Sequence, residues 1–330
     1  MSERASESSV QRERASESSV QRGRASESSV QRGRASGSPA QRGRSFEVLA
    51  VGPLALVEDL GRPGLAATGV GRSGAADRAA LRLANRLVAN PEDAAAVEVT
   101  FGGLAVRAGA LLTVALTGAG APAEVDGTPV GHHALITLRP GQVLRLGVPR
   151  TGLRTYLAVR GGVAVDEVLG SRSTDVLAEL GPPRLGVGQV LPVGPEPAGL
   201  PLVDVAPVAE PPGGTVVLRA VPGPRADRIA DLAVLATTRW TASSRSDRVG
   251  MRLEGGRLDW SGEAELPSEG MVRGAVQVPS GGEPVVFLAD HPITGGYPVA
   301  AVVLDADTDR AAQVRPGQGV RFRLVAPPWT

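Results

Sequence analysis

The chain contains no cysteine and no lysine among its 330 residues, and only 3% of the residues are aromatic. The lack of cysteine excludes disulfides, thiolate nucleophiles and cysteine-based zinc or iron sites, and it favours an intracellular, cytoplasmic setting. The lack of lysine excludes a Walker-type phosphate lysine and a Schiff base. All 35 basic residues are therefore arginines. Any nucleotide held by this chain must rely on arginine, backbone amides or a metal ion.

Long apolar runs and histidines are scarce as well. No apolar run approaches eighteen residues, so a membrane partner is not expected, while 42% hydrophobic content predicts a globular chain with room for two domains. His132 and His133 are adjacent and would face opposite sides of a strand, and His291 stands alone. We interpret all three as turn or surface residues and expect no metal site.

The first 44 residues form a ten-residue repeat. RASESSVQRE at 4–13 recurs as RASESSVQRG at 14–23 and 24–33 and decays to RASGSPAQRG at 34–43. Isolated Ala and Val residues cannot bury enough surface to offset the entropy of ordering, so a disordered tail is predicted over residues 1–44. The tail has nine Arg and five Glu, a net charge of +4, which leaves 1 − 4 = −3 for the rest. We interpret it as a duplicated leader or a mis-assigned start, and weak contact of the tail with an acidic partner or nucleic acid is the alternative. For the protein as a whole, no nucleic-acid partner is expected.

Beyond residue 44 the chain is predicted to be mainly β with a few helices. Short apolar runs between Gly, Pro and Asp turns are typical of barrels or sandwiches. The runs are FEVLAV (46–51), LLTVAL (111–116), QVLRLGV (142–148), TYLAV (155–159), TVVLRAV (215–221), VRGAVQV (272–278) and PVVFLA (284–289). Helices are expected at 77–88 and 226–236.

A Pro-rich stretch divides the chain. Residues 195–214 have the composition of a connection between domains, which predicts a first domain over 45–200 and a second over 201–330. RPGQVLRL at 139–146 and RPGQGVRF at 315–322 suggest two related halves, although a Pro-Gly turn before a strand is common enough to arise by chance.

Three loops carry candidate binding residues. GVGRSG at 69–74 formally matches a dinucleotide fingerprint, but no buried strand precedes it, so we expect Ser73 to cap a helix within a polar loop. Its polar neighbours are Asp59, Arg62, Arg72 and Asp77. Arg172 and Ser173 in GSRST (170–174) suit a carboxylate or a phosphate, and a hydroxyl-capped turn is the alternative. Arg248 is expected either to bind a ligand carboxylate or to pair internally with Asp247 or Glu254.

The segment from Leu266 to Pro298 concentrates polar groups at the ends of two apolar runs. Its candidates are Ser268, Glu269, Gln277, Asp290, Thr294, Gly295, Gly296 and Tyr297. The glycines let the backbone approach a ligand, or they serve ordinary turns of a β-hairpin. Both interpretations remain open for this segment taken alone.

Seven motifs in order resemble the biotin-dependent carboxyltransferase family. They are DLGRPGLAATGVGRSGAAD (59–77), AN…LVAN (84–90), YLAVRGG (156–162), GSRST (170–174), SDRVGMRL (246–253), SEGMVRGAVQVP (268–279) and TGGYP (294–298). Members of this family include the C subunit of 5-oxoprolinase, the KipI antagonist and the carboxyltransferase portion of urea carboxylase. The resemblance implies tandem cyclophilin-like β-barrels. The chain departs from the family pattern at two places, Asp290-His291-Pro292-Ile293 and Val249.

The resemblance also implies one component of a larger enzyme. The leading expectation is the C subunit of an ATP-dependent 5-oxoprolinase, a hydrolase that opens 5-oxoproline to glutamate together with its A subunit and a KipI-like B subunit. ATP is used by the complex, and whether this chain binds it stays open. The chain has no lysine to carry biotin. The alternatives are a carboxyltransferase for a urea-like amide served by a separate biotin carrier, and a non-catalytic regulatory partner.

Opening a lactam requires a carboxylate to move a proton and donors to polarise the carbonyl. We therefore expect Asp290 or Glu269 to act on the proton and Arg172 and Arg248 to neutralise negative charge. Ser173, Ser268, Gln277, Thr294 and Tyr297, with the backbone at Gly295 and Gly296, are expected to orient the amide. Asp59, Arg62 and Asp77 complete the predicted substrate site.

Overall fold

The computed structural model describes residues 43–260 and 266–327. Of the predicted tail, only Gly43 and Arg44 are therefore described, and the predicted disorder lies outside the described residues. Among the described residues, the longest helix has 10 residues, well short of the length that a membrane span requires.

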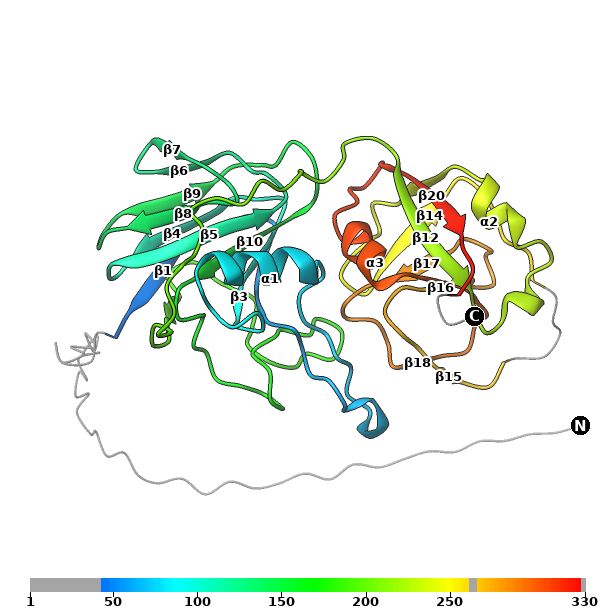
Figure 1. Cartoon of the computed structure of the whole chain (residues 1–330). Coiled ribbons are helices and arrows are strands. Elements are labelled where there is room, and N and C mark those ends of the chain that lie inside the picture. The colour runs from blue at the N-terminus through cyan, green and yellow to red at the C-terminus, as the bar shows by residue number, and fades with distance from the viewer. Residues whose placement is uncertain (1–42, 261–265, 328–330) are drawn as a thin grey trace, which may run out of the picture. The chain divides into compact units, whose positions relative to one another are not determined.

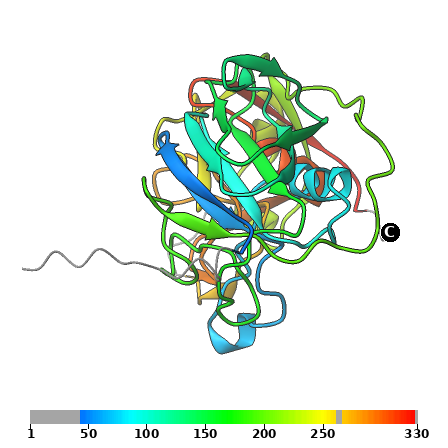
Figure 2. The same ribbon diagram turned by 90° about the vertical axis from the view of Figure 1, so that its left-hand side faces the viewer.

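Two antiparallel sheets build the first half of the described chain, which we define as residues 45–192 (Figures 1 and 2). The first sheet has the order β11-β1-β4-β9-β6-β7, with β1 (Ser45–Val51), β4 (Leu104–Ala108), β6 (Ala123–Val125), β7 (Thr128–Val130), β9 (Val143–Leu146) and β11 (Val190–Pro192). The second has the order β2-β3-β10-β5-β8, with β2 (Leu54–Glu58), β3 (Ala96–Thr100), β5 (Leu112–Gly118), β8 (Leu135–Leu138) and β10 (Arg154–Val159).

The second sheet is covered on both faces. Leu157 and Val159 of β10 point into the core shared with the first sheet, whereas Tyr156 and Ala158 pack against helix α1 (Arg78–Leu87). This explains why every residue of β10 is buried. Figure 1 shows α1 lying across this sheet. The helix predicted at 77–88 is thus confirmed.

The second half, residues 216–324, is a closed barrel of seven strands. Their order is β12-β19-β16-β17-β14-β13-β20, with β12 (Val216–Pro222), β13 (Trp240–Ala242), β14 (Gly250–Glu254), β16 (Ala275–Gln277), β17 (Val285–Phe287), β19 (Val299–Val303) and β20 (Gly319–Leu324). The parallel pairing of β12 with β20 closes the barrel around buried Trp240. The predicted boundary at residue 200 falls between β11 and β12.

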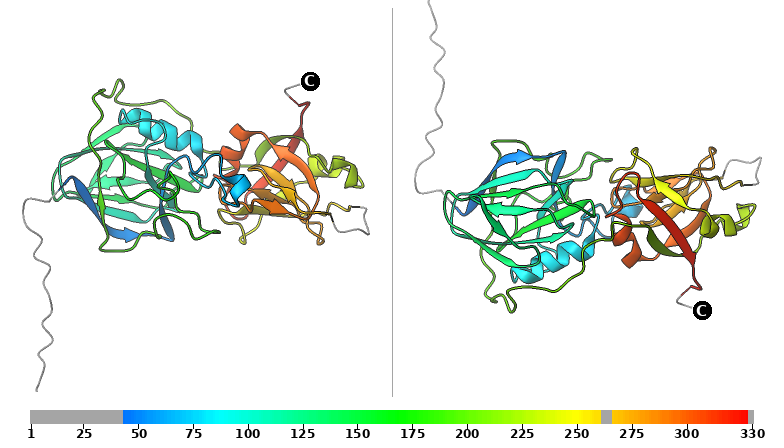
Figure 3. Two further views of the ribbon diagram at one scale, coloured as in Figure 1. Left: turned by 90° about the horizontal axis from the view of Figure 1, so that it is seen from below. Right: turned by 90° about the horizontal axis from the view of Figure 1, so that it is seen from above.

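Short helices accompany the barrel, and here the sequence expectation was partly wrong. The helix predicted at 226–236 is two pieces, a 3-10 turn at Ala226–Arg228 and α2 (Ala233–Thr237). A further helix, α3 (Asp305–Ala311), was not predicted. It lies beside α1 (Figure 3), and the N–H of Arg78 donates to Asp309 Oδ1 at 3.0 Å. A 3-10 turn at Ala66–Thr68 completes the helical elements of the described residues.

The repeated RPGQ motif builds the same turn twice. In each copy the Gln side chain accepts a hydrogen bond from the N–H of the Arg three residues earlier, at 2.9 Å for Gln142 and 3.0 Å for Gln318. The glycine between them has a positive φ in both copies, +87° at Gly141 and +81° at Gly317, as a type II turn requires. The two sequence copies are therefore structural equivalents, each leading into a strand.

Candidate functional site

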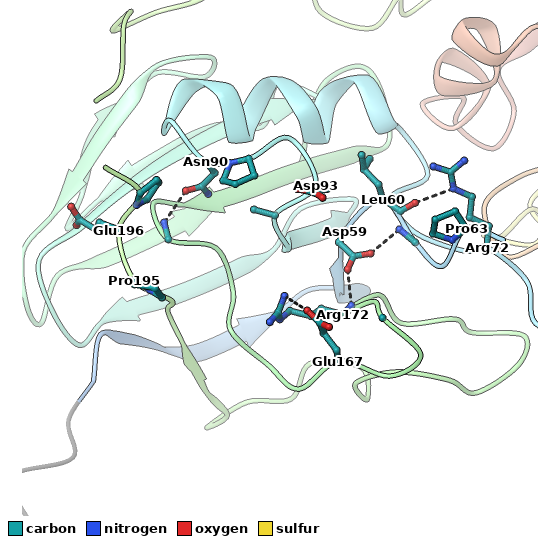
Figure 4. A pocket seen from close by; sticks show the side chains of 16 residues that line it. Asp59, Leu60, Pro63, Arg72, Asn90, Asp93, Glu167, Arg172, Pro195 and Glu196 are labelled. Atoms are coloured by element: carbon teal, nitrogen blue, oxygen red, sulfur yellow. Dashed lines mark hydrogen bonds and ion pairs between the residues drawn. The ribbon is translucent and has the colours of Figure 1, made fainter. Parts of the chain in front are cut away.

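A polar pocket of about 680 Å³ opens beside the end of β2 (Figure 4). We call it the Asp59 pocket. The loops after β2, after α1 and after β10 form its walls, together with residues 195–197. Its lining residues are Asp59, Leu60, Gly61, Pro63, Arg72, Asn90, Pro91, Asp93, Ala94, Gly161, Glu167, Gly170, Arg172, Pro195, Glu196 and Pro197.

Asp59 holds two of these loops together. The hydroxyls of Ser171 and Ser173 donate to Asp59 Oδ1 at 2.7 and 2.6 Å. The backbone N–H groups of Arg172 and Gly61 donate to the same carboxylate at 2.6 and 2.7 Å. A carboxylate with four donors is satisfied and fixed in place. Asp59 and Ser173, which is fully buried, therefore position the pocket wall.

Arg62 reinforces the same junction. Its Nε donates to the Val168 carbonyl at 3.0 Å, and Nη2 donates to the Ser173 carbonyl at 2.5 Å. The side chain is buried and does not line the pocket. The structure thus places this predicted binding residue behind the loop.

Two other arginines reach the pocket with N–H groups available. Arg172 donates from Nε to the Val165 carbonyl at 2.8 Å and pairs through Nη1 with Glu167 at 2.7 Å. Arg72 is exposed and donates from Nε to the Leu60 carbonyl at 3.1 Å. Within residues 43–260 and 266–327, Nη2 of Arg172 and both Nη atoms of Arg72 have no partner. Such groups can bind a carboxylate.

Acidic and amide side chains complete the pocket. Asp93 is exposed, and no hydrogen bond or ion pair holds it within the described residues. The Asn90 side chain accepts from the Gly161 N–H and donates to the Val159 carbonyl, both at 2.8 Å. Neither Asn90 nor Asp93 was predicted from the sequence to be a site residue. The Asn90-Pro91 and Gly161-Gly162 pairs are visible in the sequence, but only the fold brings them together, since Asn90 and Gly161 are 71 residues apart.

A buried cluster of charges joins the two halves. We call it the Arg248 cluster. Nε and Nη2 of Arg248 donate to the two oxygens of Asp290 at 2.8 and 3.0 Å, and Nη1 donates to Glu98. Nη2 also donates to the Gly74 carbonyl at 2.7 Å and lies 3.2 Å from Glu58 Oε1. The internal pairing that the sequence left open therefore occurs, but the expected partners Asp247 and Glu254 were wrong.

Asp290 is fully committed to this cluster. Besides Arg248, it accepts from the Ser73 hydroxyl at 2.6 Å and from the Val176 N–H at 3.1 Å. Arg248 is 2% exposed and Asp290 only 1%. Ser73 was expected to cap a helix, and this expectation was wrong: Asp77 is the cap, accepting from the Ala80 N–H at 2.9 Å.

The carboxyls of the Arg248 cluster differ in protonation. Burial raises the pKa of Glu58 well above its ordinary value, although Arg248 opposes this. Burial also works against ionisation of Glu98, but Arg248 and Arg154 hold the pKa of Glu98 below its ordinary value. These shifts favour a neutral Glu58 carboxyl and an ionised Glu98 carboxylate beside the guanidinium of Arg248.

The raised pKa of Asp77 predicts that the stability of the fold depends on pH. Burial, followed by the nearby Asp309, raises the pKa of Asp77 from 3.8 to about 6. A raised carboxyl pKa stabilises the fold at low pH, and that stability is lost as the pH rises through 6. In Asp77→Asn this loss is absent, so the free energy of unfolding should rise relative to wild type by about 2 kcal/mol between pH 4 and 7. Urea denaturation across this range measures it, and a difference independent of pH would contradict it.

The remaining candidates lie together at one edge of the barrel. β15 (Glu269–Gly270) pairs with β18 (Thr294–Gly295), which brings the SEG and TGGYP motifs side by side. Arg225 Nε donates to Glu269 Oε1 at 2.8 Å. A Cβ on Gly295 would lie 2.6 Å from Gln277 Nε2, so a side chain at this position would displace the Gln277 amide. Ser268, Gly296 and Tyr297 are exposed.

The predicted site residues thus fall into separate groups. Asp59 and Arg172 line the Asp59 pocket, Arg248 and Asp290 form the buried cluster, and no residue of 268–297 lines that pocket. Val176, close to GSRST, reaches Asp290. That the GSRST, SEG and TGGYP motifs share a single cavity stays a prediction. In the described part of the chain, no group of three or more His, Asp or Glu residues is placed to hold a metal ion.

Comparison with known proteins now identifies the family. The sequence profile described as "carboxyltransferase domain, subdomain A and B" matches residues 68–324. The chain belongs to this carboxyltransferase family. The C subunit of 5-oxoprolinase from Escherichia coli (strain K12) is 38% identical over 282 residues, which covers 84% of this chain and 90% of that protein. Urea amidolyase of Lachancea kluyveri is 32% identical over 306 residues, 84% of this chain but 17% of that protein.

Solved structures of this carboxyltransferase family share the fold. The crystal structure of TTHA0988 is 34% identical, with a TM-score of 0.77 over 86% of this chain and 56% of that chain. The K. lactis urea amidolyase structure is 28% identical, with a TM-score of 0.81 over 86% of this chain and 19% of that one. The chain therefore spans about half of the first and a fifth of the second. The predicted mainly β, barrel-containing fold class is confirmed.

Proposed function

We propose that this chain is the C subunit of an ATP-dependent 5-oxoprolinase complex, which opens 5-oxoproline to glutamate together with the A and B subunits. The observation that carries this proposal is the similarity to the C subunit of E. coli 5-oxoprolinase across 90% of that protein. The complex uses ATP and is active as an assembly in the cytoplasm. No biotin is attached to this chain, because it has no lysine.

The Asp59 pocket offers the chemistry that this substrate needs. 5-Oxoproline carries a carboxylate on a lactam ring, and the free N–H groups of Arg172 and Arg72 match a carboxylate. Asp93 is an exposed carboxylate in the same pocket and can accept a proton. The Asp59 hydrogen bonds fix the Arg172 loop, so its donors are held in place before the substrate arrives.

A carboxyltransferase for a urea-like amide is the second candidate. The similarity to Lachancea kluyveri urea amidolyase favours it, as does the TM-score of 0.81 with the K. lactis enzyme. This activity would require a separate biotin carrier. Inhibition by avidin distinguishes it from 5-oxoprolinase, which would be unaffected.

The test is reconstitution with the neighbouring gene products. The full chain, co-expressed with candidate A and B subunits, should release glutamate from 5-oxoproline only when ATP is present. Stable binding to a KipI-like partner without any turnover, with or without a biotin carrier, would overturn the proposal and favour a regulatory role.

Arg172→Gln should lower kcat/KM of this complex by about 10- to 100-fold, because a charged hydrogen bond to the substrate carboxylate is lost. Arg107→Gln is the matched control: Arg107 pairs with Glu47 at 2.8 Å on the surface of the first sheet, much as Arg172 pairs with Glu167 at 2.7 Å. Arg107→Gln should leave turnover unchanged. Equal rates for both variants would remove Arg172 from the substrate site.

A further inference from the structure

A second cavity, of about 440 Å³, lies between α1, α3 and the segment that connects the two halves. We call it the His133 cavity. It shares no lining residue with the Asp59 pocket. Much of its wall is apolar, formed by Ala79, Ala80, Leu83, Val208, Ala209, Pro211, Pro212 and Ala306. Its volume is in the range of pockets that hold small molecules.

His133 is held in this cavity in an unusual state. Its φ is +54°, a left-handed conformation that residues other than glycine rarely adopt. Backbone hydrogen bonds of 2.7 Å to the Leu116 carbonyl and from the Ala206 N–H maintain it. The residue is 7% exposed, and neither ring nitrogen has a hydrogen-bond partner in the described part of the chain. A left-handed residue whose ring lines a cavity and has no hydrogen-bond partner there is a candidate for binding a ligand.

The charge state of the ring limits what it can bind. Burial lowers the pKa of His133, although Glu210 opposes this. The imidazole is therefore neutral at pH 7 and presents one nitrogen as a hydrogen-bond acceptor and the other as a donor. A ligand that donates a hydrogen bond would satisfy the acceptor.

Glu210 adds an uncompensated negative charge to the same cavity. No ion pair is found for Glu210 among the described residues, whereas the lining cations Arg86 and Arg310 pair with Glu92 at 2.7 Å and Asp307 at 3.6 Å. A Cβ on Gly120 would lie 2.3 Å from Glu210 Oε1, so the glycine leaves room for this carboxylate. The free charge of the cavity is therefore negative.

We propose that the His133 cavity is a binding site for a small primary amine with an apolar body. The ammonium group donates to the Glu210 carboxylate and to the neutral imidazole of His133. The apolar body packs against Leu83, Val208 and Pro211. This site is separate from the Asp59 pocket and does not depend on the function proposed for it.

Histidine NMR of the full chain tests the proposal, because the sequence has only three histidines. Their ring Cε1–H signals are assigned by His132→Gln, His133→Gly and His291→Gln; glycine tolerates the φ of +54° at position 133. Titration with 2-phenylethylamine should shift the His133 signal saturably, with a Kd of about 1 mM for a fragment of this size. The His291 signal should not move.

Two comparisons test whether the Glu210 carboxylate and the ammonium group of the ligand recognise each other. Glu210→Gln should weaken binding about tenfold, since a charged hydrogen bond is lost, while Glu283→Gln, at an exposed glutamate of the barrel, should leave it unchanged. The uncharged 2-phenylethanol should also bind about tenfold more weakly than the amine. An unmoved His133 signal up to about 10 mM probe, or equal binding of amine and alcohol, would overturn the proposal.

Discussion

Replacing Arg248 with methionine should lower the free energy of unfolding by about 3–5 kcal/mol. Methionine keeps much of the side-chain volume but removes the guanidinium, which leaves Asp290 buried without its cation and Glu98 with Arg154 alone. Separation of these charges from water makes their unpaired state unfavourable. Urea denaturation at pH 7 measures the loss.

Arg245→Met is the matched control for this change. Arg245 lies on the same loop and is 61% exposed, with ion pairs of 3.4 Å to Glu254 and 3.3 Å to Glu283. Exposed pairs of this kind contribute about 1 kcal/mol or less. Similar losses for the two variants would show that the Arg248 cluster is not responsible for the stability ascribed to it.

Asp59→Ala should destabilise the protein by about 3–5 kcal/mol and abolish glutamate release by the reconstituted complex. Two serine hydroxyls and two backbone N–H groups lose their common acceptor, and each unsatisfied buried group costs about 1–3 kcal/mol, part of which rotation of the hydroxyls recovers. The loop that carries Arg172 would then be released from β2.

Asp126→Ala is the control, because it shows what the loss of an aspartate that does not join two loops costs. Asp126 is exposed and accepts one bond, from the Val143 N–H at 2.9 Å. Its replacement should cost about 1 kcal/mol or less and leave turnover intact. Wild-type stability in Asp59→Ala would show that the two loops hold together without the carboxylate.

Local patterns in the sequence predicted much of the fold. All seven predicted apolar runs contain a strand, because alternating or continuous apolar residues between Gly and Pro turns suit a half-buried or fully buried sheet. Helix α1 was predicted from its apolar stripe. α3 was missed because its buried residues include Asp307, Thr308 and Asp309, so its inward face looks like a solvated one. Asp309 is buried by contacts with the other half, where it accepts from the N–H groups of Arg78 and Ala79. Asp307 instead pairs with Arg219 of its own half.

The candidate site was harder to predict for the same reason. Arg248 was expected to pair with Asp247 or Glu254, yet its partners Asp290 and Glu98 lie 42 and 150 residues away. The position of Asp77 predicted that it begins a helix, and the family resemblance predicted that it binds substrate. Only the structure shows that it is buried and has a raised pKa. Motifs therefore indicated which residues matter, whereas their roles depended on contacts between distant segments.

The Arg248 cluster makes the barrel and the paired sheets thermodynamically interdependent. A fragment ending before β12 would retain Glu58 and Glu98 without Arg248, and a fragment beginning there would retain Arg248 without Glu98. Each severed piece would keep one ion pair, Arg154 with Glu98 or Arg248 with Asp290, but the pairing of Arg248 with Glu98 that joins the halves would be lost, so cooperative melting in one transition follows for the intact chain.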